Sequence, residues 1–318
     1  MTRSPSIRLG ISRCLLGEEV RYDGGHKRDR FLTDVLGRYV EWVPICPEVE
    51  AGFGTPREAM RLVGDAKKPQ LITIKTERNL TKPLAMFTEP KLETLETADL
   101  SGYVFKKDSP SCGIARVRIF NRHGMLSRNG VGLFARAFME RFPLVPIEDE
   151  GRLCDPVLRD NFIERVFCYH RWQMLTRGPL TRNDVVEFHT RHKYLLLAHN
   201  RQHYQQLGRL VARADRYRPT ELIERYGMLF MGALAVTATP RKHVNVLQHV
   251  IGHMKDQLGP SERAELDGVI EDYRQGLVPL VVPMTLVKHY VVRYRIDYVR
   301  DQVYLNPHPK EMKLRNSI

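Results

Sequence analysis

Three cysteines stand in surroundings that share one pattern, and thiolates are ligands that soft metals prefer. Cys14, Cys46 and Cys112 each follow a short run of β-branched, aromatic or aliphatic residues and precede a segment rich in Gly, Pro or Ser. This pattern predicts three strands that end in loops. If the strands are parallel neighbours, their carboxyl ends lie at one sheet edge, where α/β folds bind ligands. The three thiols would then face one cavity.

The alternative is three unrelated buried thiols, because free Cys packs as a small hydrophobic residue. All three, however, lie at predicted strand ends and none lies in mid-strand, which favours a shared site. Three thiolates suit an iron-sulfur cluster better than structural zinc. Structural zinc usually takes a fourth protein ligand and comes with Cys-x-x-Cys pairs, and the chain has no such pair.

The elements that would position these cysteines alternate between strands and helices, which is typical of an α/β fold. We therefore expect a Rossmann-like N-terminal domain over residues 1–147. Its predicted strands are 7–13, 40–45, 71–75, 102–107 and 115–120, and its predicted helices are 28–39, 91–99, 131–142 and a short one after the Gly and Pro loop that follows Cys46.

The second half of the chain has a helical pattern. Residues 148–160, with acidic and proline residues, are predicted to be a linker, and 161–318 a mainly α-helical domain. The predicted helices are 161–175, 184–212, 221–235, 241–258 and 261–276, with Asn183 or Asp184 and Ser261 as caps. Cys154 and Cys168 are interpreted as structural.

Composition and charge bound the functional class. The chain has 318 residues, 42% hydrophobic and 27% charged, with five cysteines in no regular framework. The start MTRSPSIRLG carries no long apolar stretch or cleavage signal, so we expect no membrane association, a cytoplasmic location and free thiols. Residues 1–150 hold 24 Lys and Arg against 20 Asp and Glu, and 151–318 hold 26 against 17. The basic second half favours a polyanionic partner such as RNA, although a merely solvated surface is the alternative.

Histidines in the second half are open to several interpretations. His249 and His253 have the spacing of a metal pair, but no Cys or carboxylate completes a ligand set. Together with His192, His199 and His203, they lie among basic residues, which fits an RNA-facing surface, and ordinary packing is the remaining possibility. The basic candidates for RNA contact are Arg191, Lys193, Arg241 and Lys242.

The motifs resemble known families. GISRCLLGEEVRYDGGHK, ICPEVEAGFGTPREAMRL and KKDSPSCG resemble the thiouracil desulfidase (TudS) family. FHTRHKYLLLAHN, RKHVNVLQHVIGHMK and YLNPHPKEMKLRN resemble the YbgA-like domain, and the fusion resembles tRNA 4-thiouridine desulfidases of the RudS type. The resemblance covers nearly the whole chain, and the three cysteine motifs occur in the same order.

The resemblance implies a 4Fe-4S cluster on Cys14, Cys46 and Cys112, with tRNA as the partner. No obligate protein partner is evident from the sequence. It implies that the open iron binds the sulfur of a thiolated pyrimidine, that Glu48 activates water and that Ser109 binds or protonates the substrate. Such hydrolysis needs no net redox change. The further substrate-binding candidates are Tyr22, Asp23, Lys107 and Ser111.

Two rival hypotheses stay open. The first is a desulfidase of free thiouracil or of another thiolated nucleoside. The second is a non-enzymatic RNA-binding or redox-sensing protein in which the cluster is structural or sensory.

The three motif cysteines, and not the other two, are predicted to hold the cluster. Single Ser replacements at Cys14, Cys46 and Cys112 should each lower the iron bound per chain and abolish turnover, because each removes one thiolate ligand. Cys154→Ser and Cys168→Ser are the matched controls and should leave both quantities nearly intact. Iron analysis after anaerobic reconstitution checks this, and a full cluster in Cys112→Ser would overturn the ligand set.

Overall fold

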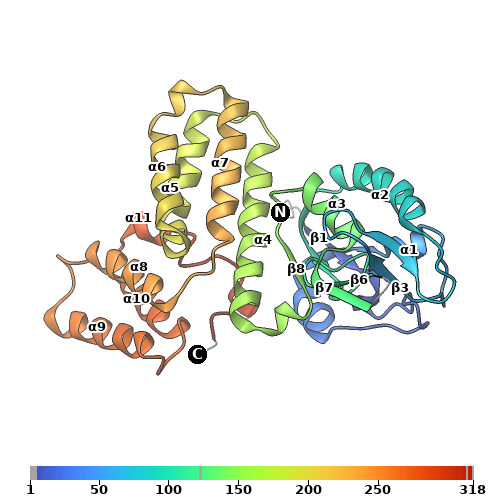
Figure 1. Ribbon diagram of the computed structural model, residues 1–318. Coiled ribbons are helices and arrows are strands. Elements are labelled where there is room, and N and C mark those ends of the chain that lie inside the picture. Colours follow the sequence, from blue (N-terminus) through green and yellow to red (C-terminus); the bar gives the residue numbers. More distant parts are fainter. Residues whose placement is uncertain (1–5, 122–123, 313, 317–318) are drawn as a thin grey trace. The chain divides into compact units, whose positions relative to one another are not determined.

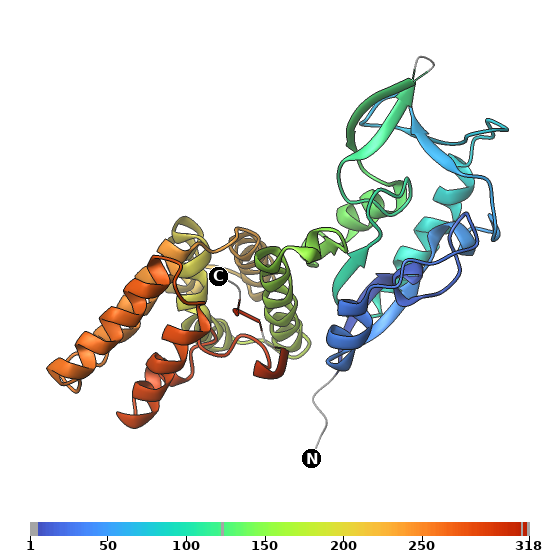
Figure 2. The ribbon, with the colours of Figure 1, turned by 90° about the horizontal axis from the view of Figure 1, so that it is seen from below.

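The computed structural model describes residues 6–121, 124–312 and 314–316. The chain divides into two compact units, Met1–Asp155 and Pro156–Ile318 (Figures 1 and 2). The first unit mixes strands and helices and the second is built from helices, so the predicted fold class is confirmed. No helix in the described part is long and apolar enough to cross a membrane.

The first unit contains a four-stranded parallel sheet in the order β2-β1-β5-β8. The strands are β1 (Ile7–Ser12), β2 (Val40–Ile45), β5 (Leu100–Phe105) and β8 (Ile147–Asp149). Ser12 pairs with Ile45 in β2, and Ile11 pairs with Val104 in β5. The carboxyl ends of β2, β1 and β5 therefore lie at one edge of the sheet, as the cysteine pattern predicts.

Close packing of aromatic rings holds this sheet against its covering helices. Every residue of β5 is buried, and the rings of Tyr103 and Phe105 stack with centroids 3.9 Å apart. Phe138 of α3 (Leu133–Arg141) meets both rings edge-on. Gly10 in β1 makes this arrangement possible, because a Cβ there would lie 2.2 Å from the Tyr103 ring. Helix α2 (Thr81–Glu96) packs beside α3 (Figure 1).

A second sheet in the same unit is mixed, in the order β4-β3-β6-β7. Its strands are β3 (Met60–Val63), β4 (Gln70–Thr73), β6 (Val117–Asn121) and β7 (Gly124–Gly130). Leu62 of β3 pairs with Ile119 of the parallel strand β6. Both side chains belong to a buried cluster that Leu84 of α2 completes.

Several predicted elements of the first unit differ from the observed ones. The predicted helix 28–39 is a π-helical turn, Phe31–Val35, followed by a 3-10 turn, Leu36–Arg38. After Cys46 the helix α1 (Pro47–Glu50) comes first, and the predicted short helix is strand β3. Helix α2 begins well before residue 91, and β7 and β8 were not expected. The acidic residues of β8 concealed it, since Glu148 is a buried strand residue that binds Arg152.

The second unit consists of helices in two groups (Figure 1). The first group is α4 (Pro156–Thr176), α5 (Arg182–His199), α6 (Arg201–Ala212) and α7 (Pro219–Leu234); the second is α8 (Pro240–Gly252), α9 (Pro260–Arg274), α10 (Val281–Arg293) and α11 (Asp297–Arg300). Trp172, Phe188, Tyr226 and Phe230 pack ring against ring in the core of the first group. Its apolar interior explains the helical periodicity of the sequence.

Helix ends in this unit differ from the sequence prediction. The predicted helix 184–212 is interrupted at Asn200, whose side chain accepts hydrogen bonds from the N–H groups of Gln202 and His203 at 3.0 and 3.1 Å. Thr181 caps α5 in place of Asn183 or Asp184. Gly259, not Ser261, caps α9 and donates its N–H to Glu262. Helices α10 and α11 lie beyond the last predicted segment.

The break at Asn200 yields a stability prediction. Asn200→Ala should lower the free energy of unfolding by about 1 kcal/mol, because two N–H groups at the start of α6 lose their acceptor. Asn245→Ala, at an exposed position inside α8, is the control and should change it by less than about 0.5 kcal/mol. Urea unfolding monitored by circular dichroism measures both, and equal losses would show that the cap does not stabilise the unit.

Candidate functional site

The three motif cysteines meet at the carboxyl edge of the parallel sheet. Cys14 lies in the 3-10 turn Arg13–Leu16 that follows β1, Cys46 directly follows β2, and Cys112 lies in the loop after β5. All three are buried and free of disulfides, and all line one cavity of about 490 Å³. The sequence prediction that they share a cavity is therefore confirmed.

The loop that carries Cys112 is shaped by a serine hydroxyl. Ser109 Oγ accepts hydrogen bonds from the N–H groups of Ser111 and Cys112, at 3.2 and 3.0 Å. The loop also packs tightly against the chain before α3, where a Cβ on Gly132 would lie 2.5 Å from the backbone of Ser111. These contacts fix the direction in which the Cys112 side chain leaves the backbone.

Burial keeps the three thiols protonated when no cation is bound. It raises the pKa of Cys14 to about 11, raises that of Cys46 and raises that of Cys112 well above its usual value. A coordinated metal reverses this preference, since a thiol that binds a metal loses its proton. Three such groups around one cavity act as thiolate ligands only if a metal centre supplies the positive charge.

The arrangement is not that of a single-ion site. Among the described residues, no three His, Cys, Asp or Glu side chains come together as ligands of one metal ion. In an iron-sulfur cluster the thiolates bind different irons, so their sulfurs need not converge on one point. Three buried thiols that line one cavity fit such a cluster.

Glu48 lies in the same cavity and forms a buried ion pair that the sequence did not reveal. Arg57 Nε donates to Glu48 Oε2 at 2.9 Å, and the two side chains are only 7% and 11% exposed. Arg57 Nη1 also donates to the carbonyl oxygens of Val20 and Gly54. The other carboxylate oxygen, Oε1, lies 3.5 Å from Ser109 Oγ. Arg57 thus fixes the carboxylate, and Oε1 is turned towards Ser109.

The other predicted substrate-binding residues separate into two groups. Tyr22, which is 45% exposed, and Lys107 line the cavity. Asp23 does not; it accepts hydrogen bonds from Arg21 and from the N–H of Gly25, as expected of a turn residue. Ser111 is fully buried outside the cavity lining, and its hydroxyl has no hydrogen-bond partner among the described residues.

Cations dominate the charge of the cavity wall. Arg13, Arg21, Arg57 and Lys106 are each paired with an acidic residue. Four more line the cavity, and their side chains have no acidic partner in the described part of the chain: Lys27, Arg61, Lys107 and Arg118. The acidic lining residues are Glu48 and Asp108. Arg61 and Arg118 come together because they precede Leu62 and Ile119, which pair across β3 and β6; sequence alone gave no sign of this pairing.

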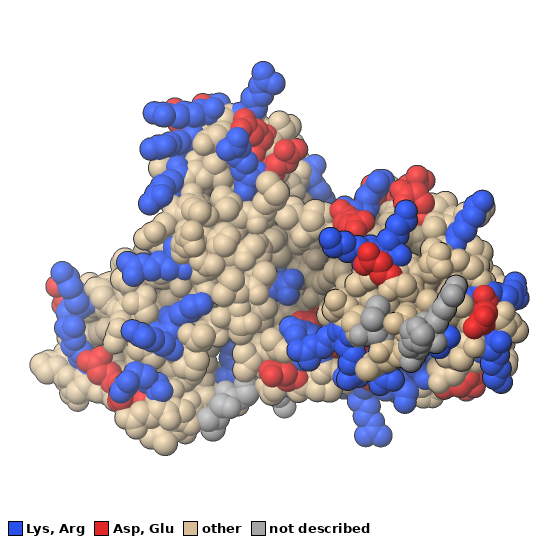
Figure 3. Space-filling model, in the orientation of Figure 1, with Lys and Arg blue, Asp and Glu red and all other residues tan. Residues whose placement is uncertain are grey.

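The four basic side chains predicted to contact RNA differ in whether their charged groups already have a partner within the protein. Arg191 and Arg241 are exposed. Lys193 lies over the Tyr298 ring at 4.5 Å, and Lys242 Nζ donates to the carbonyl oxygen of His199 at 2.6 Å. On the face shown in Figure 3, Lys and Arg outnumber Asp and Glu over the helices.

Two of the histidines are core residues rather than RNA contacts. His192 is buried, with Nδ1 2.7 Å from the carbonyl oxygen of Phe188. His199 is buried between Glu164 and the carbonyl oxygen of Val236. The interpretation of these two as surface groups is wrong, because helix packing turns them inwards.

Comparison with known proteins finds a matching family for each of the two parts of the chain. The family described as 2-thiouracil desulfurase matches residues 9–150, and the one described as protein of unknown function (DUF1722) matches 193–309. The Escherichia coli (strain K12) "Uncharacterized protein YbgA" is 32% identical over 159 residues, 50% of this chain and 94% of that protein. The Bacillus subtilis (strain 168) "Uncharacterized protein YbbK" is 31% identical over 111 residues, 32% of this chain and 71% of that protein.

One solved structure is also similar, the "[4Fe-4S]-dependent thiouracil desulfidase TudS". It is 26% identical, with a TM-score of 0.37, and the match covers 46% of this chain and 93% of that one.

The Glu48–Arg57 pair predicts a stability difference between two arginines. Arg57→Met should lower the free energy of unfolding of the first unit by about 3 kcal/mol, because it leaves a buried carboxylate without its partner. Adding Glu48→Gln should recover part of that loss. Arg21→Met, which breaks a more exposed pair, is the control and should cost less than about 1 kcal/mol. Amide hydrogen exchange in β1 and β5 reports this unit, and equal effects of the two arginine variants would contradict the interpretation.

Proposed function

We propose that the chain is a tRNA desulfidase, because residues 9–150 match the 2-thiouracil desulfurase family and residues 193–309 match the DUF1722 family. The proposed reaction converts 4-thiouridine in tRNA to uridine and sulfide by hydrolysis. One observation carries it: three buried thiols, a fixed carboxylate and unpaired cations line a single cavity.

Cys14, Cys46 and Cys112 would hold a 4Fe-4S cluster. With three protein thiolates, a bound cluster supplies an open iron that acts as a Lewis acid towards the sulfur of a thiocarbonyl. The three buried thiols that line one cavity support this cofactor.

The chain's own residues supply the proton transfers. Glu48 is the general base, and its Oε1 accepts a proton from water while Arg57 holds Oε2 in place. Arg57 is therefore a positioning residue. The Ser109 hydroxyl accepts two backbone N–H bonds and donates its own proton to Glu48 Oε1 at 3.5 Å; in the proposed reaction this proton turns to the substrate. Water gives its oxygen to the ring carbon, sulfur leaves as sulfide, and no electrons are gained or lost.

The charge of the cavity favours a substrate that carries phosphate. Free thiouracil is uncharged at neutral pH and would leave Lys27, Arg61 and Arg118 without partners, whereas the phosphates beside a nucleotide in RNA would pair with them. The excess of Lys and Arg in the helical unit supports an RNA of some length (Figure 3). We assign Arg191 and Arg241 as tRNA contacts, and Lys193 and Lys242 as weaker ones because their ammonium groups already have partners.

A desulfidase of free thiouracil is the second candidate, because the matching family is described by that substrate. Turnover on thiolated tRNA and on free 4-thiouracil, compared at equal concentration, separates the two. A tRNA enzyme should show the higher kcat/KM on tRNA, and the ratio should fall as salt screens the phosphate contacts.

Glu48→Gln tests the proposed base. The variant keeps the size of the side chain but removes the proton acceptor, so we expect the cluster to be retained and desulfurisation of tRNA to slow by roughly 10²- to 10⁴-fold. Glu19→Gln, at an exposed position in the Cys14 loop, is the matched control and should keep the wild-type rate. Single-turnover assays by nucleoside analysis measure both. A wild-type rate in Glu48→Gln would assign the base to another group.

A further inference from the structure

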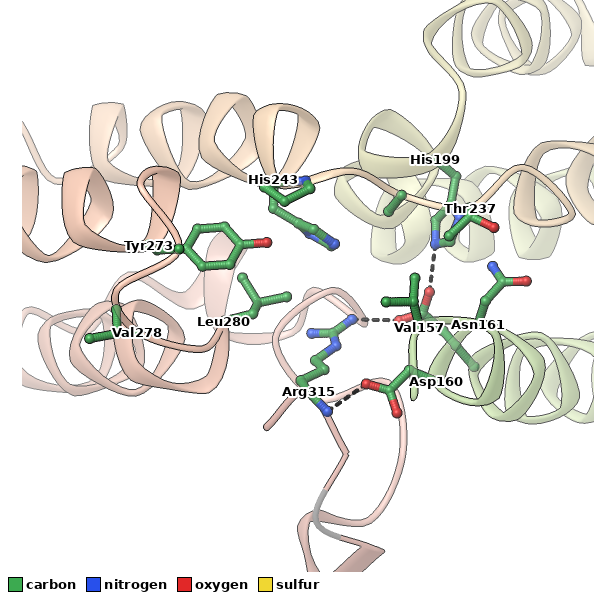
Figure 4. A pocket seen from close by; sticks show the side chains of 14 residues that line it. Val157, Asp160, Asn161, His199, Thr237, His243, Tyr273, Val278, Leu280 and Arg315 are labelled. Atoms are coloured by element: carbon green, nitrogen blue, oxygen red, sulfur yellow. Dashed lines mark hydrogen bonds and ion pairs between the residues drawn. The ribbon is translucent and has the colours of Figure 1, made fainter. Parts of the chain in front are cut away.

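The helical unit encloses a second cavity, which the proposed chemistry does not use. Its volume is about 180 Å³, and Figure 4 shows the side chains around it. Its wall comes from helix α4, the last residue of α5, the loop before α8, α8 itself, the end of α9 with the loop that follows it, and the segment near Arg315. The exposed lining residues Val157, Pro240 and Gly276 show that it opens to solvent.

Buried charges in the wall compensate one another. Glu164 accepts from His199 Nε2 and from Arg315 Nη2, each at 2.5 Å, and Asp160 accepts the backbone N–H of Arg315 at 2.7 Å. Both ring nitrogens of His199 are engaged, Nε2 with Glu164 and Nδ1 with the carbonyl oxygen of Val236. Both carboxylates of the wall are thus already bound by His199 or Arg315, so the wall offers no unpaired charge to a charged ligand, which would be costly to bury there.

Two of the hydrogen-bonding side chains in the wall, His243 and Tyr273, have donors that face a ligand. The Tyr304 hydroxyl is buried, and His243 Nδ1, at 3.0 Å, is its only hydrogen-bond partner among the described residues. Its proton therefore goes to Nδ1, which leaves the His243 Nε2–H as a donor at the cavity. Burial lowers the pKa of His243 to about 3, so the ring stays neutral. Figure 4 shows the Tyr273 hydroxyl directed into the same space; it has no hydrogen-bond partner in the part of the chain described.

Size and lining restrict the ligand further. An apolar cavity of about 150 Å³ accepts benzene, so this one has room for a single six-membered ring with small substituents. Leu280, Ala238 and Val157 offer apolar surface to the faces of such a ring. The donors of His243 and Tyr273 suit carbonyl oxygens at its edge. A neutral pyrimidine has this combination of shape and hydrogen-bonding groups.

The cations expected to contact RNA lie beside the cavity. Arg241 directly follows Pro240, which lines it, and Lys242 Nζ binds the carbonyl oxygen of His199, another lining residue. A base inserted here would thus leave its phosphates near Arg241. Proteins that recognise single-stranded RNA commonly bind an unstacked base in a pocket and the adjoining phosphates with Arg or Lys.

We propose that this cavity binds one unstacked pyrimidine base, an inference that rests on the proposed RNA substrate. The base is not the one that reacts, because the three thiols belong to the other unit. The helical unit would then bind RNA through one base in this cavity as well as through contacts between its cations and the phosphates.

Filling the cavity tests this without using turnover. Ala238→Leu adds volume inside it, and Ala235→Leu makes the same change at an exposed position three residues earlier. With the full-length chain and tRNA that carries no thiolation, Ala238→Leu should weaken binding roughly 5- to 150-fold, the usual worth of one base contact. Ala235→Leu should bind like the wild type. Fluorescence anisotropy at fixed salt measures the affinities.

A second variant keeps the test decisive if Ala238→Leu does not fold. Tyr273→Phe removes one hydroxyl without changing the size of the ring and should weaken binding roughly 2- to 10-fold, the worth of a hydrogen bond. The bound base can belong to a free nucleoside or to an RNA strand, and competition with uridine distinguishes these two sources. Displacement by uridine from the wild type means that free nucleosides also bind, and no displacement means that the base must belong to an RNA strand.

The outcomes separate this inference from the proposed reaction. If tRNA affinity depends on Ala238 and Tyr273 but 4-thiouridine is not desulfurised, the proposed reaction fails and the base pocket stands. If 4-thiouridine is desulfurised while both variants bind tRNA and uridine like the wild type, the pocket assignment is overturned.

Discussion

Parallel pairing of β2, β1 and β5 is the constraint on which the candidate site depends. Because the three strands run in one direction and their register is matched, the residues that follow them reach the same edge of the sheet. Cys14, Cys46 and Cys112 are far apart in the chain and meet only for this reason. The tight contact between Gly10 and the Tyr103 ring holds β1 and β5 in that register, and so connects core packing with the chemistry at the edge.

Burial then determines what the site can do. Water is largely excluded from the thiols, which therefore stay neutral until a metal centre supplies positive charge. Glu48 tolerates the same environment because Arg57 compensates its charge and leaves Oε1 for a proton. In the helical unit, Glu164 is hydrogen-bonded to both His199 and Arg315, so this buried carboxylate is compensated in the wall of that unit's own cavity.

Local patterns were sufficient to predict much of this molecule, and tertiary pairing decided the rest. The cysteine strands were predictable because each apolar run ends at a Gly, Pro or Ser segment. Strand β8 was missed because buried Glu148 and Asp149 resemble a polar connector until their partners are known. The sequence did not predict a role for Arg57, because only folding brings its side chain to Glu48. The break at Asn200 was missed since helical periodicity continues on both sides of a cap.

Isotope labelling tests most directly whether hydrolysis takes place at the sheet edge that carries Cys14, Cys46 and Cys112. The anaerobically reconstituted protein would be incubated with 4-thiouridine-containing tRNA in H₂¹⁸O without an electron donor, and the nucleosides and sulfide quantified. Hydrolysis predicts one sulfide and one uridine labelled at O4 for each 4-thiouridine lost. Unlabelled uridine, or a reaction that proceeds only when a reductant is added, would contradict it.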